Sequence, residues 1–249
     1  VNGSLSTAAG ASITGTATSG LILNGTGNVS LIFSPTGAIL DTLVVSQTNG
    51  NVTLNSNLKV VGNVYLQQGS LVLNGNNLTT NGTVTTSPGA TITGSTTSGL
   101  ILDGMGNLLL VFSPNGALLD TLVVSQSNGN AILNTNLTVG SHVNLQQGAL
   151  VLNGHDLTVQ GTFSNAVGAS ITGSISSGLI LDGTGNVSLV FSPNTAFLNT
   201  LVVSQTNGNV TLNADLAVGG SVDLQAGSLV LNGKDLTING SLNTSAGAS

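Results

Sequence analysis

The 249-residue chain has a formal net charge of −6, and only 4% of its residues are charged, where about 25% is usual in soluble domains. Its only lysines are Lys59 and Lys234, and it contains no Arg. Binding to nucleic acid or to anionic membranes requires clustered basic residues, so neither partner is expected. No apolar run approaches the roughly 20 residues of a membrane helix, so no membrane insertion is expected.

The composition is that of strands and turns. Hydrophobic residues make up 40% of the chain, and the abundant Thr, Val, Ile, Asn, Gly and Ser favour strands and turns. We therefore predict an all-β fold. The absence of Cys excludes disulfides and thiolate-bound metals, and Cys-free chains rich in Thr, Asn and Gly suit secreted bacterial proteins. The chain begins at Val1 with no visible signal peptide, so we interpret it as a mature chain or a piece of a longer one.

A 79-residue repeat organises the chain. The heptapeptide Ser-Gly-Leu-Ile-Leu-Asn-Gly at 19–25 returns at 98–104 and again at 177–183, with Asp in place of Asn. Leu-Val-Leu-Asn-Gly at 71–75 returns twice with the same spacing, and no insertion or deletion interrupts the pattern. We predict one continuous solenoid over residues 1–249. Its parts are the end of a repeat (1–18), two full repeats (19–97 and 98–176) and an incomplete repeat (177–249).

A shorter period lies inside each repeat. Leu58, Gly62, Val64 and Gly69 are followed by the same residue types 20 positions later. Four coils of about 20 residues would fill one 79-residue repeat. Coils of this length, built from short strands with Gly and Asn corners, are typical of a β-solenoid. We predict a right-handed parallel β-helix, because crossovers between parallel strands are almost always right-handed.

Alternation along residues 58–73 predicts which side chains form the core. The positions expected to point inward hold Leu or Val, namely Leu58, Val60, Val64, Leu66, Leu71 and Leu73. The position between the first two is Lys59 here, Thr138 in the next repeat and Ala217 in the one after, as expected of an outward position. For Val72 the pattern leaves the direction open, because a shift of 20 aligns it with Ile92 and a shift of 21 does not.

One set of apolar side chains is expected to face outward in every repeat. If Leu21, Leu23, Leu43 and Val45 belong to the core, the residues between them point to solvent. These residues form the candidate lateral-contact set, which consists of Ile22, Val44, Ile101, Val123, Ile180 and Val202. A repeated exposed β-branched stripe is a candidate for side-by-side association. Ordinary strand propensity explains the same residues equally well.

No catalytic, cofactor-binding or metal site is predicted. Lyases and glycosidases built on β-helices need paired carboxylates, but Asp and Asn interchange here: Asp103 and Asp182 correspond to Asn24. This exchange favours a role in turns, so we expect no enzyme. The Asp-Gly-Met-Gly-Asn stretch at 103–107 supplies a single carboxylate, which makes it a poor calcium loop.

Two alternatives to a structural role stay open. Ice-binding solenoids carry flat arrays of Thr-x-Thr on every coil. Thr91, Ile92 and Thr93 match that motif, but it occurs once per repeat rather than once per coil. The other alternative is a β-helix that binds or degrades polysaccharide.

The stretch 63–79, Asn-Val-Tyr-Leu-Gln-Gln-Gly-Ser-Leu-Val-Leu-Asn-Gly-Asn-Asn-Leu-Thr, resembles coils of very large secreted bacterial surface proteins, including filamentous haemagglutinin-like adhesins. The resemblance covers essentially the whole chain and carries no site residues with it. It implies a secreted, cell-surface protein that forms stiff extracellular filaments and mediates adhesion. The partners that we expect are further copies, end to end and side by side, and cell-surface or polysaccharide ligands.

Overall fold

A computed structural model describes residues 5, 10–36, 38–114, 117–192 and 196–249. These residues form 22 strands and no helix, which confirms the predicted all-β class.

The strands fall into three similar series, one per repeat. The first series is β1 (Gly20–Thr26), β2 (Val29–Leu31), β3 (Ile39–Leu40), β4 (Thr42–Leu54), β5 (Leu58–Val60), β6 (Val64–Val72), β7 (Leu78–Thr80), β8 (Val84–Thr86) and β9 (Thr91–Thr93). The second is β10 (Gly99–Gly104), β11 (Leu108–Leu110), β12 (Leu118–Leu133), β13 (Leu137–Val151), β14 (Leu157–Val159), β15 (Thr162–Asn165) and β16 (Ser170–Thr172). The third is β17 (Gly178–Leu181), β18 (Val187–Leu189), β19 (Phe197–Leu212), β20 (Leu216–Val230), β21 (Leu236–Ile238) and β22 (Ser241–Thr244).

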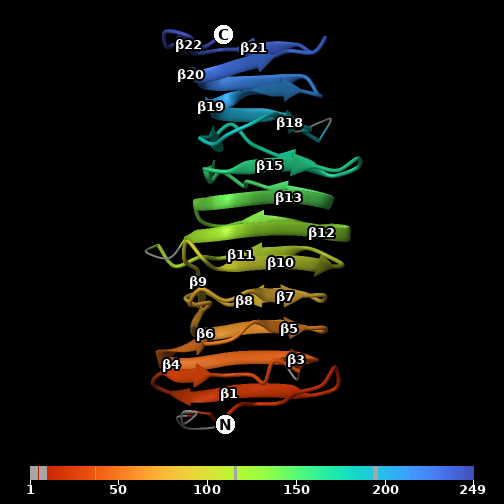
Figure 1. Ribbon diagram of the computed structural model, residues 1–249, viewed down its shortest axis with the longest axis vertical. Helices are drawn as coiled ribbons and strands as arrows, with labels where there is room; N and C mark the ends of the chain where they lie inside the picture. Colours follow the sequence, from red (N-terminus) through yellow and green to blue (C-terminus); the bar gives the residue numbers. More distant parts are fainter. Residues whose placement is uncertain (1–4, 6–9, 37, 115–116, 193–195) are drawn as a thin grey trace.

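The strands stack in parallel along the length of the molecule. Figure 1 shows them lying across the long axis, with the two termini at opposite ends. Strand β1 pairs with β4, β4 with β6, and β6 with β8, all in parallel register. The chain completes about ten turns in this way, which confirms the predicted parallel β-solenoid.

The core is a narrow column of aliphatic side chains. All six positions predicted to point inward along residues 58–73 are buried. Aromatic rings enter the column at one equivalent position of every repeat, held by Phe33, Phe112 and Phe191, and also at Phe163. Phe112 is fully buried and forms a parallel bridge with Ile92 of the preceding coil. The backbone of Phe112 also donates a hydrogen bond to Thr135 Oγ1 of the following coil. Alternation of inward and outward side chains therefore fixes both the register and the core.

Asn-Gly pairs form the corners of the coils. Asn74 and Gly75 have φ values of 52° and 79°, in the left-handed region that Gly and Asn tolerate best. The Asn74 side chain also donates a hydrogen bond of 2.8 Å to Asn55 Oδ1 on the preceding coil. Val72 lies at the end of β6, just before this corner. It pairs with Thr93 rather than with Ile92, and its half-buried side chain points outward.

The repeat does not contain a whole number of turns. One row of register partners starts at Ile39 and reaches Val123 after four turns. The residue equivalent to Ile39 in the next repeat is Leu118, and four turns from Leu118 lead to Val202 rather than to its own equivalent, Phe197. The 79-residue repeat therefore ends five residues short of four turns. Equivalent residues of successive repeats are therefore displaced by five residues around the coil, which refines the expectation of four coils per repeat.

Each repeat also buries one glutamine. Gln47, Gln126 and Gln205 are 0% exposed, and their side-chain polar atoms have no hydrogen-bond partner among the described residues. Because an unpaired buried polar group costs about 1–3 kcal/mol, we expect Gln126→Met to raise the free energy of unfolding by about 1 kcal/mol. Urea denaturation measures this, with Gln126→Glu as a control that should be destabilised by its buried charge. If Gln126→Met is instead less stable than the unaltered chain, the Gln126 carboxamide has hydrogen-bond partners in solution and the prediction is wrong.

Asp120 makes the stability depend on pH. Ser141 Oγ and Thr121 Oγ1 donate hydrogen bonds to its carboxylate, and these bonds, with the nearby His142, hold the pKa of Asp120 below its usual value. The folded-state pKa is below the unfolded-state pKa, so the carboxylate stabilises the fold at neutral pH. This contribution is lost as the pH falls through the folded-state pKa. We expect Asp120→Asn to be less stable than the unaltered chain at pH 7, and the difference to shrink at about pH 3. Denaturation at both pH values measures it, and an unchanged difference would contradict the role.

Candidate lateral-contact surface

The structure divides the candidate lateral-contact set into three stacked pairs. The register partners are Ile22 with Val44, Ile101 with Val123, and Ile180 with Val202. Ile22 is 57% exposed, and the other five are half-buried. Because the repeat is shorter than four turns, the three pairs are displaced from one another around the coil and do not form one stripe. Side-by-side contact through these residues stays a prediction.

Each pair belongs to a longer outward row of register partners. Row 1 contains Ile22, Val44, Tyr65 and Thr85. Row 2 contains Ile39, Lys59, Thr79, Ile101 and Val123. Row 3 contains Leu118, Thr138, Thr158, Ile180 and Val202. Row 4 contains Phe197, Ala217 and Thr237. Rows 2, 3 and 4 begin at equivalent positions of successive repeats, so each repeat displaces its outward row by five residues around the coil.

A surface groove recurs where rows 2, 3 and 4 begin. Groove 1 has a volume of about 200 Å³ and is lined by Ala38, Asn57, Leu58, Lys59, Asn77 and Thr79. Groove 2 has a volume of about 620 Å³ and includes Ala117, Leu118, Asn136, Leu137, Thr138, Asp156 and Thr158. Groove 3 has a volume of about 430 Å³ and is lined by Ala196, Phe197, Asp215, Leu216, Ala217, Asp235 and Thr237. These residues are equivalent in the three repeats, so the groove is a property of the repeat.

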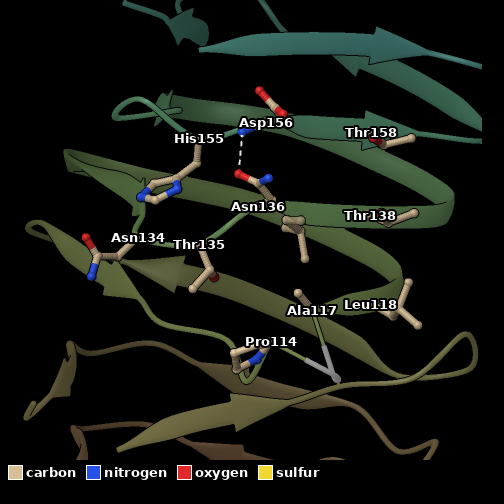
Figure 2. A pocket seen from close by; sticks show the side chains of 11 residues that line it. Pro114, Ala117, Leu118, Asn134, Thr135, Asn136, Thr138, His155, Asp156 and Thr158 are labelled. Atoms are coloured by element: carbon tan, nitrogen blue, oxygen red, sulfur yellow. Dashed lines mark hydrogen bonds between the residues drawn. The ribbon is translucent and has the colours of Figure 1, made fainter. Parts of the chain in front are cut away.

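The floor of the groove is held by a side-chain to backbone hydrogen bond. In groove 2, Asn136 Oδ1 accepts a bond of 2.9 Å from the backbone N–H of Asp156 (Figure 2). The equivalent bonds in grooves 1 and 3 measure 2.8 and 3.0 Å. Figure 2 also shows Leu118, Thr138 and Thr158 one above another along one side of the groove. The bond therefore fixes the corner between successive coils and sets the depth of the groove.

The charges of grooves 1 and 3 are opposite. Groove 1 carries the exposed Lys59 beside the two asparagines Asn57 and Asn77. Groove 3 has Ala217 at the position of that lysine, and the exposed Asp215 and Asp235 replace the two asparagines. Asp215 and Asp235 lie on adjacent coils, whose backbones are about 4.8 Å apart along the axis. Groove 1 is therefore cationic and groove 3 anionic, with the small side chain of Ala217 beside the acids.

Sequence reasoning missed the large apolar side chain at the edge of each groove. Ile39, Leu118 and Phe197 occupy one position of the repeat and are 37%, 38% and 47% exposed. The sequence does contain a signal that this position is exposed, because the residue changes from Ile to Leu to Phe in successive repeats. Core positions such as Leu58 keep one residue type in all three repeats, because a close-packed interior tolerates few changes of volume.

No family model matches the chain, and neither does any curated protein or solved structure. The resemblance to secreted bacterial surface proteins therefore stays a prediction. The described part of the chain contains no helix with the length and apolarity needed to cross a membrane.

The polar residues singled out in the sequence make structural hydrogen bonds. Asn107, at the end of the Asp-Gly-Met-Gly-Asn stretch, accepts a bond of 3.0 Å from the backbone N–H of Asn130 on the next coil. Asp103, at its start, accepts one of 3.3 Å from the Asn81 side chain. Within the described residues there is no group of three or more His, Cys, Asp or Glu side chains placed to hold a metal ion.

The threonines of the ice-binding motif have no threonine neighbours on the preceding coil. Thr91 pairs with Ser70, and Thr93 pairs with Val72. A flat threonine array therefore does not extend from this coil to the one before it.

The last described coil exposes part of the apolar column. Leu231 is 41% exposed and Leu242 is 56% exposed. Their equivalents one repeat earlier, Leu152 and Phe163, are buried, and the backbone N–H of Leu152 donates a hydrogen bond to the carbonyl oxygen of Thr172 on the next coil.

Proposed function

We propose that the chain is a structural segment of an extracellular filament or surface adhesin and acts as a stiff rod. The observation that carries this proposal is the continuity of the solenoid. Parallel pairing joins each coil to the next, and the aliphatic column runs through all of them. The function then lies in the length and stiffness of the rod rather than in a reactive site.

Stiffness follows from how the coils are joined. Backbone hydrogen bonds between coils run along the rod axis at a spacing of about 4.8 Å, so bending must lengthen many bonds at once. The inward Leu and Val side chains are close-packed and resist sliding between coils. With 4% charged residues, little repulsion separates neighbouring coils. Each coil therefore adds length without weakening the stack.

The extracellular, adhesive part of the proposal is supported by composition and by resemblance. The chain has no Cys, few charges and an abundance of Thr, Asn and Gly, as do the secreted bacterial surface proteins that it resembles. End-to-end association is included in the proposal because unpaired strand edges at the end of a stack of coils template further pairing.

Electron microscopy tests the proposed function directly. The purified chain should appear as unbranched rods of uniform width, and antibodies against it should label the surface of the cells that produce it. Compact particles without a long axis, or labelling confined to the cytoplasm, would overturn the proposal. A chain with Phe112→Ala provides the control, because a weakened core should shorten or break the rods.

A further inference from the structure

We propose that groove 1 of one rod docks side by side against groove 3 of a second copy of this chain. The inference rests on the proposed function, because it names the contact through which rods associate laterally. The occupant is a second copy rather than another partner, because the two complementary surfaces are both present on one chain.

Charge complementarity carries the proposal. Lys59 is the charged side chain of groove 1, and Asp215 and Asp235 are the charged side chains of groove 3. All three are exposed. Two like charges on adjacent coils repel each other, and a cation placed between them relieves that repulsion. Lys59 of a second copy supplies this cation.

The shapes are complementary as well. In groove 3 the position equivalent to Lys59 is Ala217, so groove 3 has no large side chain at this position beside its two carboxylates. Ile39 is the register partner of Lys59, and Phe197 lines groove 3. These apolar side chains are 37% and 47% exposed and gain a partner in the contact. The next two residues of row 2 after Thr79 are the half-buried Ile101 and Val123. They extend the surface of groove 1 along the rod axis.

The geometry makes the contact open-ended. Grooves 1 and 3 are different surfaces of one chain, so the contact is heterologous, and each copy offers one groove of each kind. The shortfall of five residues per repeat displaces the two grooves from each other around the coil. A second copy on groove 1 therefore leaves groove 3 free for a third copy, and the rods assemble into bundles rather than closed pairs.

Charge reversal tests the docking. Lateral association of the purified chain is measured by light scattering and electron microscopy at low salt. We expect Lys59→Asp to weaken it about tenfold, and the double variant Asp215→Asn/Asp235→Lys to do the same. Asn at position 215 keeps the acceptor of the bond at the groove floor, as Asn57 does in groove 1. The triple variant that combines all three changes should restore association, because the positive and negative charges at positions 59 and 235 are then exchanged. High salt should weaken association of the unaltered chain.

Lys234→Asp is the matched control. It changes the net charge as much as Lys59→Asp does, but Lys234 lines a hollow beside Asp215 rather than groove 1. We expect it to leave association intact or to strengthen it. Equal weakening by both lysine changes, or no rescue in the triple variant, would overturn the proposal. Circular dichroism of each variant shows whether the fold is kept.

Two further outcomes separate the docking from the proposed function. Single, unbundled rods at low salt would overturn the docking and leave the rod function standing. If such rods sediment with an insoluble polysaccharide in a way that depends on Lys59, groove 1 is a polysaccharide site and self-docking is wrong. If no rods form at all, the proposed function fails first.

Discussion

Gly129→Ala should destabilise the rod by about 3 kcal/mol or more. A Cβ at this position would lie 2.0 Å from the carbonyl oxygen of Gly106 and 2.1 Å from its carbon. Both contacts are with the backbone of the coil below, so the new methyl group can be accommodated only by separating two hydrogen-bonded coils. The equivalent glycines, Gly50 and Gly208, meet the same obstacle at 1.9 Å. Urea denaturation and hydrogen exchange in the flanking coils measure the effect.

Gly140→Ala is the control for this substitution. The nearest atom to a Cβ there is the Leu119 carbonyl oxygen at 3.7 Å, an ordinary contact distance. The change should leave the denaturation midpoint almost unaltered. Similar losses in the two variants would mean that the close approach of coils at Gly129 is not what makes that position intolerant.

Phe112→Ala should cost about 3–5 kcal/mol. The ring is fully buried in the aliphatic column, and its backbone bridges Ile92 on one side and bonds to Thr135 on the other. Truncation removes the transfer free energy of the ring and leaves a cavity that stacked, hydrogen-bonded coils cannot collapse to fill. In a repeat protein the loss is local, so hydrogen exchange should rise most in β11 and β12.

Leu118→Ala provides the comparison for Phe112→Ala. Leu118 is 38% exposed at the edge of groove 2, so its truncation should change the free energy of unfolding by less than about 1 kcal/mol. A large loss of stability from this variant would place Leu118 in the core. It would also remove the edge of the groove as an exposed surface.

Much of the fold could be predicted from the sequence, because the interior imposes a strict alternation. Leu58 is buried as expected, and its neighbour Lys59 is exposed. The number of turns per repeat could not be obtained in this way. The 79-residue period fixes how often a pattern returns, but the number of residues in one turn varies. Register partners are 19 residues apart at Val52 and Leu71 and 23 residues apart at Val29 and Val52. Only the register of the strands shows that four turns from Ile39 end at Val123 rather than at the equivalent residue, Leu118.

The unknown number of residues per turn also explains why the arrangement of the candidate lateral-contact set could not be predicted. The outward direction of Ile101 and Val123 could be predicted from alternation, but their place in one row with Lys59 depends on the unequal lengths of the coils. The grooves were missed because Phe197 and its equivalents look like core residues in a sequence. An apolar type alone does not reveal whether the next coil covers a side chain.

X-ray diffraction from aligned filaments of the chain shows whether the coils are stacked along the filament axis. In the structure the strands lie across the long axis (Figure 1), so the hydrogen bonds between coils run along it. If the rod is the functional form, a strong reflection at about 4.7–4.9 Å should lie on the meridian, parallel to the filament axis. The same reflection on the equator would mean that the strands run along the filament. It would contradict a rod in which coils are stacked along the axis.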